Sequence, residues 1–191
     1  HGFQVKKAPY DSNIRSPLIF SMPSRLPSSE VCNHPVGGTD IAPTLLAFAG
    51  VETPWTMHGH DLSPLLTEPT RETWDHPVLT IDTAWNFGDD TDVVPIATDP
   101  ESHHRLYARG QVPWWVSLVE GHWKYIRTLV PDEPEELYDL QNDPEELTNL
   151  ARDPDYREQV LEMRAATLEE LRRTGADLVD SLPAVAALPT P

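Results

Sequence analysis

The sequence predicts an α/β protein with two structured regions and a tail. An apolar run at 16–22 precedes a helix-like stretch at 39–50, and one β-α unit of this kind is typical of the margin of a parallel sheet. Several short strand-like segments joined by short connections follow between 76 and 140, which favours an antiparallel sheet. We therefore expect an α/β region at 1–75, an antiparallel sheet with a helix at 76–175, and a mobile tail at 176–191.

In the first region a polar loop leads into the segment SPLIFSM, residues 16–22, which its apolar centre predicts to be a buried strand. A helix is expected over 39–50, where Thr39 or Asp40 is a suitable N-cap and Gly50 ends the apolar pattern. A short amphipathic turn is expected at 61–66.

In the second region Glu120-Gly121 separates two alternating apolar segments, which is a strong signal for a hairpin. An antiparallel sheet of about four strands is therefore predicted. Its strands are expected at 77–81, 114–119, 122–130 and 136–140.

Two helix starts are predicted in the last third, at Asp143-Pro144 and at Asp153-Pro154. The second helix should run to about Thr174, because Gly175 follows it and apolar residues recur at helical spacing. The expected core-facing positions are Val160, Arg164, Leu168 and Leu171, with Leu161 and Met163 beside them. The Ala/Pro-rich tail that follows is predicted to be mobile.

Charge and composition exclude several classes of function. The net charge of −17 argues against a nucleic-acid partner or an anionic membrane, since both need clustered Lys and Arg. No apolar run approaches the roughly 20 residues of a membrane span. The single cysteine, Cys32, excludes an intrachain disulfide framework, and nothing in the composition decides the compartment. No Met precedes His1, so we expect the chain to begin within a longer protein.

Residues 82–113 form a long segment with little predicted structure. It is rich in Asp and contains two basic groups of residues, His103-His104-Arg105 and Arg109. Long segments of this kind are usually functional or disordered. Two interpretations stay open: the basic residues line a pocket mouth for an anionic substrate, or the segment is a flexible surface loop.

The order of several short motifs resembles the sulfatase family, over residues 1 to about 153. A first group, His1-Gly2, Lys6, Tyr10-Asp11 and Arg15-Ser16-Pro17-Leu18-Ile19, resembles the family pattern HG-x-x-x-K-x-x-x-[YF]-[ED]…R-x-P-L-I. Further matches are Asp40-Ile41-Ala42-Pro43-Thr44-Leu45-Leu46, Gly59-His60-Asp61-Leu62-Ser63-Pro64-Leu65-Leu66, Lys124-Tyr125-Ile126, Glu136-Leu137-Tyr138-Asp139-Leu140 and Asp143-Pro144-Glu145-Glu146. Asp61 stands where the family commonly has Ser.

The resemblance implies the C-terminal portion of an alkaline-phosphatase-like α/β fold, with an edge of the main sheet followed by a small four-stranded antiparallel sheet and a helix. It implies hydrolysis of a sulfate ester, of a small molecule or carbohydrate, by a formylglycine nucleophile and a divalent metal, usually Ca²⁺. The formylglycine and the metal ligands would lie upstream, in the N-terminal part of the same protein, so no metal ligand is expected in this chain. Lys6 matches the lysine that contacts the sulfate oxygens, and His1 is a weaker candidate for substrate contact. On this interpretation the chain alone is inactive.

Two alternatives remain open at this stage. The same framework serves phosphodiesterases and phosphonate monoester hydrolases, which could use the same lysine. The chain could instead be a non-catalytic module that serves as a lid, a specificity loop or an oligomer contact.

Other candidate sites have simpler structural interpretations. Ser21-Met22-Pro23-Ser24-Arg25 fits the S-x-P-S-R pattern of a modified nucleophile, but it follows the lysine motif instead of preceding it. His58 and His60 are expected to be hydrogen-bonded structure, because no third metal ligand accompanies them. Asp89-Asp90 with Asp92 lacks the Gly and the terminal Glu of a calcium loop. Tyr10, Asp11 and Arg15 are expected to be structural, with Arg15 pairing with a carboxylate to anchor the loop that carries Lys6.

Overall fold

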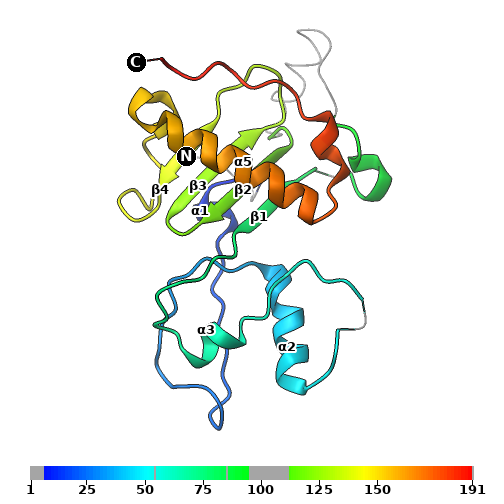
Figure 1. Cartoon of the computed structure of the whole chain (residues 1–191), viewed down its shortest axis with the longest axis vertical. Helices are drawn as coiled ribbons and strands as arrows, with labels where there is room; N and C mark the ends of the chain where they lie inside the picture. Colours follow the sequence, from blue (N-terminus) through cyan, green and yellow to red (C-terminus); the bar gives the residue numbers. More distant parts are fainter. Residues whose placement is uncertain (1–6, 54, 85, 95–111, 191) are drawn as a thin grey trace. The chain divides into compact units, whose positions relative to one another are not determined.

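The computed structural model describes residues 7–53, 55–84, 86–94 and 112–190. The chain forms two compact units: residues 16–78 make one, and the described residues up to Arg15 join those from Leu79 onward in the other (Figure 1). The segment that ends at Arg15, which the motif order assigns to the first region, is thus in contact with the C-terminal residues.

The C-terminal unit is built on a four-stranded sheet in the order β1-β2-β3-β4. β2 (Trp115–Glu120) and β3 (Trp123–Thr128) are antiparallel, and so are β3 and β4 (Glu136–Asp139). β1 (Val78–Asp82) completes the sheet beside β2. Glu120 pairs with Trp123, and Gly121 adopts a φ of +58° in the tight turn between them. The predicted strands and hairpin are confirmed.

One face of the sheet is covered by helix α5 (Arg157–Arg173). The Asp153 side chain accepts a hydrogen bond from the Asp155 amide just before the helix, and Gly175, with a φ of +69°, follows its end. The predicted bounds are confirmed, but the buried face is slightly rotated, since Thr167 is buried and Leu161 is 41% exposed. The core on this side contains Leu118, Tyr125, Leu137, Val160 and Met163.

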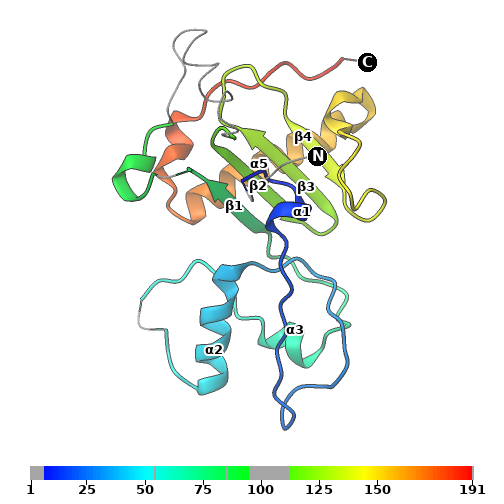
Figure 2. The same ribbon diagram turned by 180° about the vertical axis from the view of Figure 1, so that it is seen from behind.

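The opposite face of the sheet is covered by the N-terminal segment. Successive side chains of a strand point to opposite faces, so Lys124 and its cross-strand neighbour Tyr138 point away from the α5 side, where Tyr125 lies. The short helix α1 (Asp11–Ile14) and residues 7–10 lie against this second face, as Figure 2 shows. The C-terminal unit is therefore a sheet between a helix and an N-terminal segment.

The unit of residues 16–78 contains α2 (Ile41–Ala49) and the short α3 (Ser63–Thr67). A 3₁₀ turn at Gly38–Asp40 leads into α2, and Gly50 ends it with a φ of +67°. Both predicted helical elements are confirmed.

The predicted strand at 16–22 is wrong in this structure. The residues have no regular secondary structure, and Ile19 is 85% exposed. A strand needs a neighbour to satisfy its backbone groups, and no strand of the described residues pairs with this segment. Its apolar character alone did not decide its structure.

The helix predicted at Asp143-Pro144 is also wrong. The Asp143 carboxylate accepts hydrogen bonds from the amides of Leu147 and Thr148, both at 2.8 Å, and this closes a tight turn. Glu146 adopts a φ of +56° within it, which a helix does not accommodate.

The segment after α5 is tied to the C-terminal unit, although its composition predicts mobility. A 3₁₀ helix at Asp177–Ser181 buries Leu178 in the core. Farther on, the Asp132 amide donates to the Ala184 carbonyl at 3.0 Å and the Ala186 amide to the Glu133 carbonyl at 3.1 Å. Prolines favour an extended backbone whose carbonyls remain available as acceptors, so a Pro-rich segment can dock without regular structure.

Within the part of the chain that the structure describes, none of the helices is long and apolar enough to cross a bilayer.

Candidate functional site

The segment directly after Lys6 is fixed to the sheet by its backbone and by a tyrosine. The indole Nε1 of Trp115, on β2, donates to the carbonyl oxygen of Lys7 at 2.8 Å. The Tyr10 hydroxyl donates to Glu136 on β4, 3.1 Å from Oε2, and the Tyr10 ring meets Tyr138 edge-on with centroids 6.2 Å apart. Strand β2 therefore binds this segment at Lys7, and strand β4 binds it at Tyr10.

A buried ion cluster provides the next point of attachment. The Lys124 side chain is fully buried, and its Nζ lies 2.7 Å from Asp11 Oδ1 and 2.7 Å from Glu146 Oε1. The other carboxylate oxygen of Glu146, Oε2, accepts a hydrogen bond of 2.6 Å from the Asp11 backbone amide. Lys124 and Glu146 therefore bind both the side chain and the backbone of Asp11.

The electrostatics of this cluster follow from its burial. Burial raises the pKa of Glu146 above its ordinary value, while the Lys124 ammonium and the hydrogen bond from the Asp11 amide oppose that shift and the Asp11 carboxylate adds to it. Burial and the nearby Glu136 carboxylate raise the pKa of Tyr10 and of Tyr138, so both hydroxyls stay protonated and available as donors.

The predicted site residues are placed as follows. His1 and Lys6 lie outside the described residues, as do His103, His104, Arg105 and Arg109. Tyr10 and Asp11 have structural roles, as the sequence predicts, and they anchor the segment after Lys6. Arg15 pairs with a carboxylate, that of Asp11 at 3.8 Å, but its side chain is 79% exposed. The anchoring is thus carried by Asp11 and its buried partners, and little by Arg15.

Lys124, Glu146 and Glu136 are the functional candidates that sequence reasoning missed. Each lies in a segment that resembles a family motif, but no role followed from its type or spacing. One signal was available: Lys124 interrupts an alternating apolar pattern in HWKYIRTLV, and a lysine at a core-facing strand position requires an acidic partner.

In the unit of residues 16–78, Asp40 organises the polar contacts. Its buried carboxylate accepts backbone hydrogen bonds of 2.7 Å from Gly37 and from His60. Thr44 donates to the Asp40 carbonyl at 2.6 Å and accepts from the Leu62 amide at 2.8 Å. The motif that begins at Asp40 and the motif that begins at Gly59 are therefore in contact at the start of α2.

The contacts of His60 and Arg25 fit the structural interpretations. His60 stacks on His76 with centroids 4.0 Å apart, and its Nδ1 is 3.8 Å from Asp40. Arg25 donates to the Phe48 carbonyl at 3.0 Å and lies over the Phe48 ring, so it caps the end of α2. Across the described residues, no group of three or more His, Cys, Asp or Glu side chains could hold a metal ion.

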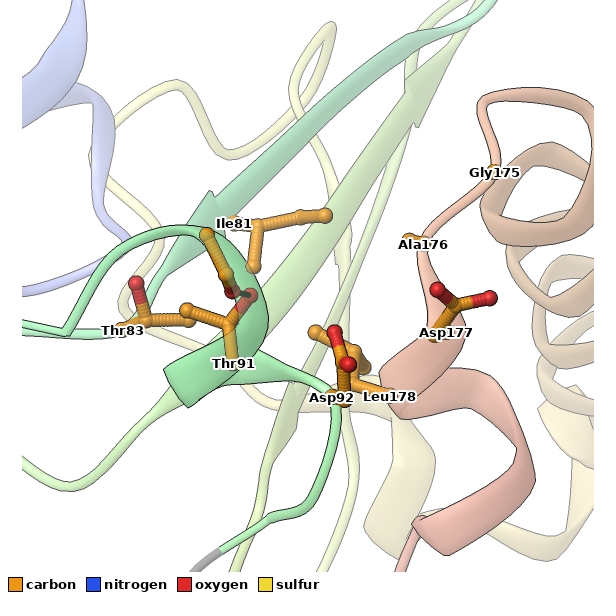
Figure 3. A pocket seen from close by; sticks show the side chains of 9 residues that line it. Ile81, Thr83, Thr91, Asp92, Gly175, Ala176, Asp177 and Leu178 are labelled. Carbon is orange, nitrogen blue, oxygen red and sulfur yellow. Dashed lines mark hydrogen bonds between the residues drawn. The ribbon is translucent and has the colours of Figure 1, made fainter.

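A cavity of about 360 Å³ lies between the end of β1 and the segment after α5 (Figure 3). Thr83, Thr91 and Asp92 line it on one side, and Asp177 and Leu178 on the other. Its charged lining residues are both acidic, so this cavity repels an anionic ester and is unsuited to bind one.

Comparison with known proteins supports the resemblance carried by the motifs. Residues 1–95 match the family model described as N-sulphoglucosamine sulphohydrolase, C-terminal. An N-acetylglucosamine-6-O-sulfatase of Bacteroides thetaiotaomicron is 36% identical over 66 residues, which are 35% of this chain and 12% of that protein. The Extracellular sulfatase SULF-1 homolog of Drosophila melanogaster is 35% identical over 71 residues, 37% of this chain and 6% of that protein.

Solved structures share the fold at low sequence identity. A phosphonate monoester hydrolase from Silicibacter pomeroyi superposes with a TM-score of 0.63 at 21% identity, covering 92% of this chain and 32% of that one. A structure in complex with its substrate D-glucosamine-2-N,6-O-disulfate gives 0.55 at 22% identity, covering 74% of this chain and 25% of that one. The predicted fold class, α/β with a four-stranded antiparallel sheet and a C-terminal helix, is confirmed. The chain spans less than a third of the length of each of these relatives.

Proposed function

Because this chain matches the C-terminal region of the sulfatase family, we propose that it is part of a hydrolase that cleaves the sulfate ester of a carbohydrate or small molecule. The observation that carries the proposal is the anchored segment that follows Lys6. A catalytic charge must be held in place before the reaction, and residues 7–11 are attached to three elements of one unit.

Lys6 is proposed to contact the sulfate oxygens. A compact ammonium placed beside them would stabilise the charge that grows on the leaving oxygen as the S–O bond breaks. His1, nearby in the sequence, is proposed as a secondary substrate contact. The similarity to the N-acetylglucosamine-6-O-sulfatase supports a sulfated amino sugar as the substrate class.

The formylglycine nucleophile and the divalent metal of the family are proposed to come from sequence upstream of His1. The described residues do not form a donor set for a divalent cation. Their buried carboxylates are already engaged: Asp40 by backbone amides, Glu146 by Lys124, Glu135 by Arg164 and Glu170 by Arg173. Ca²⁺ is the cation that the resemblance implies.

A second candidate function is hydrolysis of a phosphonate monoester or a phosphodiester. The superposition with the phosphonate monoester hydrolase from Silicibacter pomeroyi, which covers 92% of this chain, supports this candidate. A tetrahedral phosphorus oxyanion could use the same lysine. A third candidate, a non-catalytic structural or specificity module, predicts no turnover at all.

The experiment compares substrates on the enzyme that contains this chain together with the upstream part of the protein. An aryl sulfate, glucosamine 6-sulfate, an aryl phosphonate monoester and an aryl phosphodiester are assayed in parallel with Ca²⁺ present. We expect the highest kcat/KM on a sulfate ester and no turnover by the 191-residue chain alone. Preference for the phosphonate would favour the second candidate, and inactivity on all four substrates would favour the non-catalytic module.

A further inference from the structure

The ion cluster of Lys124, Glu146 and Asp11 binds both the side chain and the backbone of Asp11, which a single ion pair would not do. Lys124 is the second residue of β3, Glu146 comes from a turn after β4, and Asp11 from the segment that follows Lys6. Both carboxylates lie 2.7 Å from one ammonium nitrogen, and Glu146 also accepts the Asp11 amide. The cluster therefore fixes the direction of the backbone at Asp11, as well as its place.

The neighbouring contacts restrain the same segment closer to Lys6. The Lys7 carbonyl is held by Trp115, and Tyr10 by Glu136. The contact with Trp115 thus restrains the residue that directly follows Lys6 in the sequence. All of these partners belong to the sheet face that is opposite α5.

We propose that Lys124 and Glu146 are positioning residues of the hydrolytic reaction, which hold Asp11 against the sheet and so set the place of the Lys6 ammonium. This inference rests on the proposed function. It assigns to the small sheet a part in the reaction, as the platform of the catalytic lysine, although none of its side chains needs to touch the substrate.

Loss of the cluster should lower kcat and leave KM nearly unchanged. A displacement of about 1 Å at a charge that acts in the transition state can cost on the order of 10²-fold in rate. Lys124→Met removes the shared ammonium. Asp11→Asn is the milder variant, because Asp11 is 20% exposed and the Lys124–Glu146 pair survives.

The test uses the complete enzyme, with Arg164→Met as the matched control. Arg164 pairs with the buried Glu135 on the α5 side of the same sheet, so its loss also breaks an ion pair but leaves the N-terminal segment untouched. We expect kcat to fall roughly 10- to 100-fold in Lys124→Met and less in Asp11→Asn, with KM changed little. Arg164→Met should keep kcat while its melting temperature falls.

A double-mutant cycle with Lys6→Ala separates positioning from general damage. If Lys124 acts through Lys6, Lys124→Met should have little further effect on kcat once Lys6 is Ala. An equal further loss in that background, or an equal loss in Arg164→Met, would overturn the proposal. Unchanged kcat in a folded Lys124→Met, or in Asp11→Asn should Lys124→Met fail to fold, would also overturn it.

Hydrogen exchange keeps this inference separate from the proposed function. In Lys124→Met the amides of residues 10–14 should exchange faster than in the parent protein, and in Arg164→Met they should not. Faster exchange in an enzyme that hydrolyses no ester would support the anchoring and reject the proposed function. Unchanged exchange in Lys124→Met would reject the anchoring itself, whatever the activity.

Discussion

Lys124 Nζ lies 2.7 Å from Asp11 Oδ1, although 113 positions of sequence separate the two residues. The lysine is fully buried, so the contact exists only because Asp11 and Glu146 provide the negative charge that a buried ammonium needs. Together with the contacts of Trp115 and Glu136, this relationship connects the N-terminal segment with the sheet.

The first prediction concerns Glu146 and pH. The folded protein raises the pKa of Glu146, so the folded state holds its proton at a pH where the unfolded chain has released it. The contribution of this group to stability is therefore fully present below its ordinary pKa of about 4.5 and is lost as the pH rises through the folded value. In Glu146→Gln that loss is absent, so the stability of the variant relative to the parent should improve from pH 4 to pH 7.

Urea unfolding at several pH values measures this difference directly. Asp143→Asn is a suitable control, because the Asp143 carboxylate closes the same turn by accepting backbone amides, whereas Lys124 pairs with Asp11 and Glu146. A difference between Glu146→Gln and the parent that is flat, or that moves in the opposite direction, would contradict the prediction.

The second prediction concerns the close approach of two backbones at Gly59. A Cβ at this position would lie 2.1 Å from the Thr39 carbonyl oxygen, which is backbone and cannot move aside easily. Gly59→Ala should cost roughly 1–3 kcal/mol or more in the free energy of unfolding. Gly38→Ala is the matched control, because a Cβ there meets nothing within 4 Å, and it should change stability by about 0.5 kcal/mol or less. Equal stability of the two variants would show that the loop shifts freely.

The third prediction concerns the Asp40 carboxylate. Asp40→Ala leaves the amides of Gly37 and His60 without their acceptor in a buried place, and a buried unsatisfied donor costs about 1–3 kcal/mol. Asp40→Asn keeps one acceptor oxygen and should lose less. Asp61→Ala removes an exposed contact to Ser63 and should cost the least. Denaturant unfolding of the three variants gives the order, and a reversed order would refute it.

The fourth prediction concerns Lys6 in the complete enzyme. Lys6→Ala should lower kcat roughly 10²–10³-fold, the scale for removal of one preorganised charge donor. Lys6→Arg should not restore full activity, because a planar guanidinium differs in shape from a compact ammonium. Metal content should be the same in all variants, since Lys6 is not proposed as a ligand.

Lys7→Ala is the control for Lys6, because the contact of Lys7 with Trp115 uses its backbone carbonyl, which the variant keeps. Steady-state kinetics of the variants checks the assignment. Full activity in Lys6→Ala together with loss in Lys7→Ala would move the catalytic position by one residue.

Much of the C-terminal unit could be predicted from the sequence because its signals are local. Alternation in HWKYIRTLV and the Glu120-Gly121 pair predict the hairpin, and Asp153-Pro154 and Gly175 mark the ends of α5. A turn residue or a helix cap acts on its immediate neighbours, so the sequence alone determines its effect.

What only the tertiary structure decided are the contacts between distant segments. Residues 16–22 have the composition of a strand, yet no strand of the described residues pairs with them, and they are irregular. The Ala/Pro-rich tail carries no local signal for structure, yet its carbonyls and Leu178 find partners across the unit. The sequence around Lys124 does not identify its partners, and only the fold brings Asp11 and Glu146 into contact with it. Charges and unpaired backbone groups are satisfied by whichever partners the fold brings within a few ångströms, and no spacing along the chain specifies those partners.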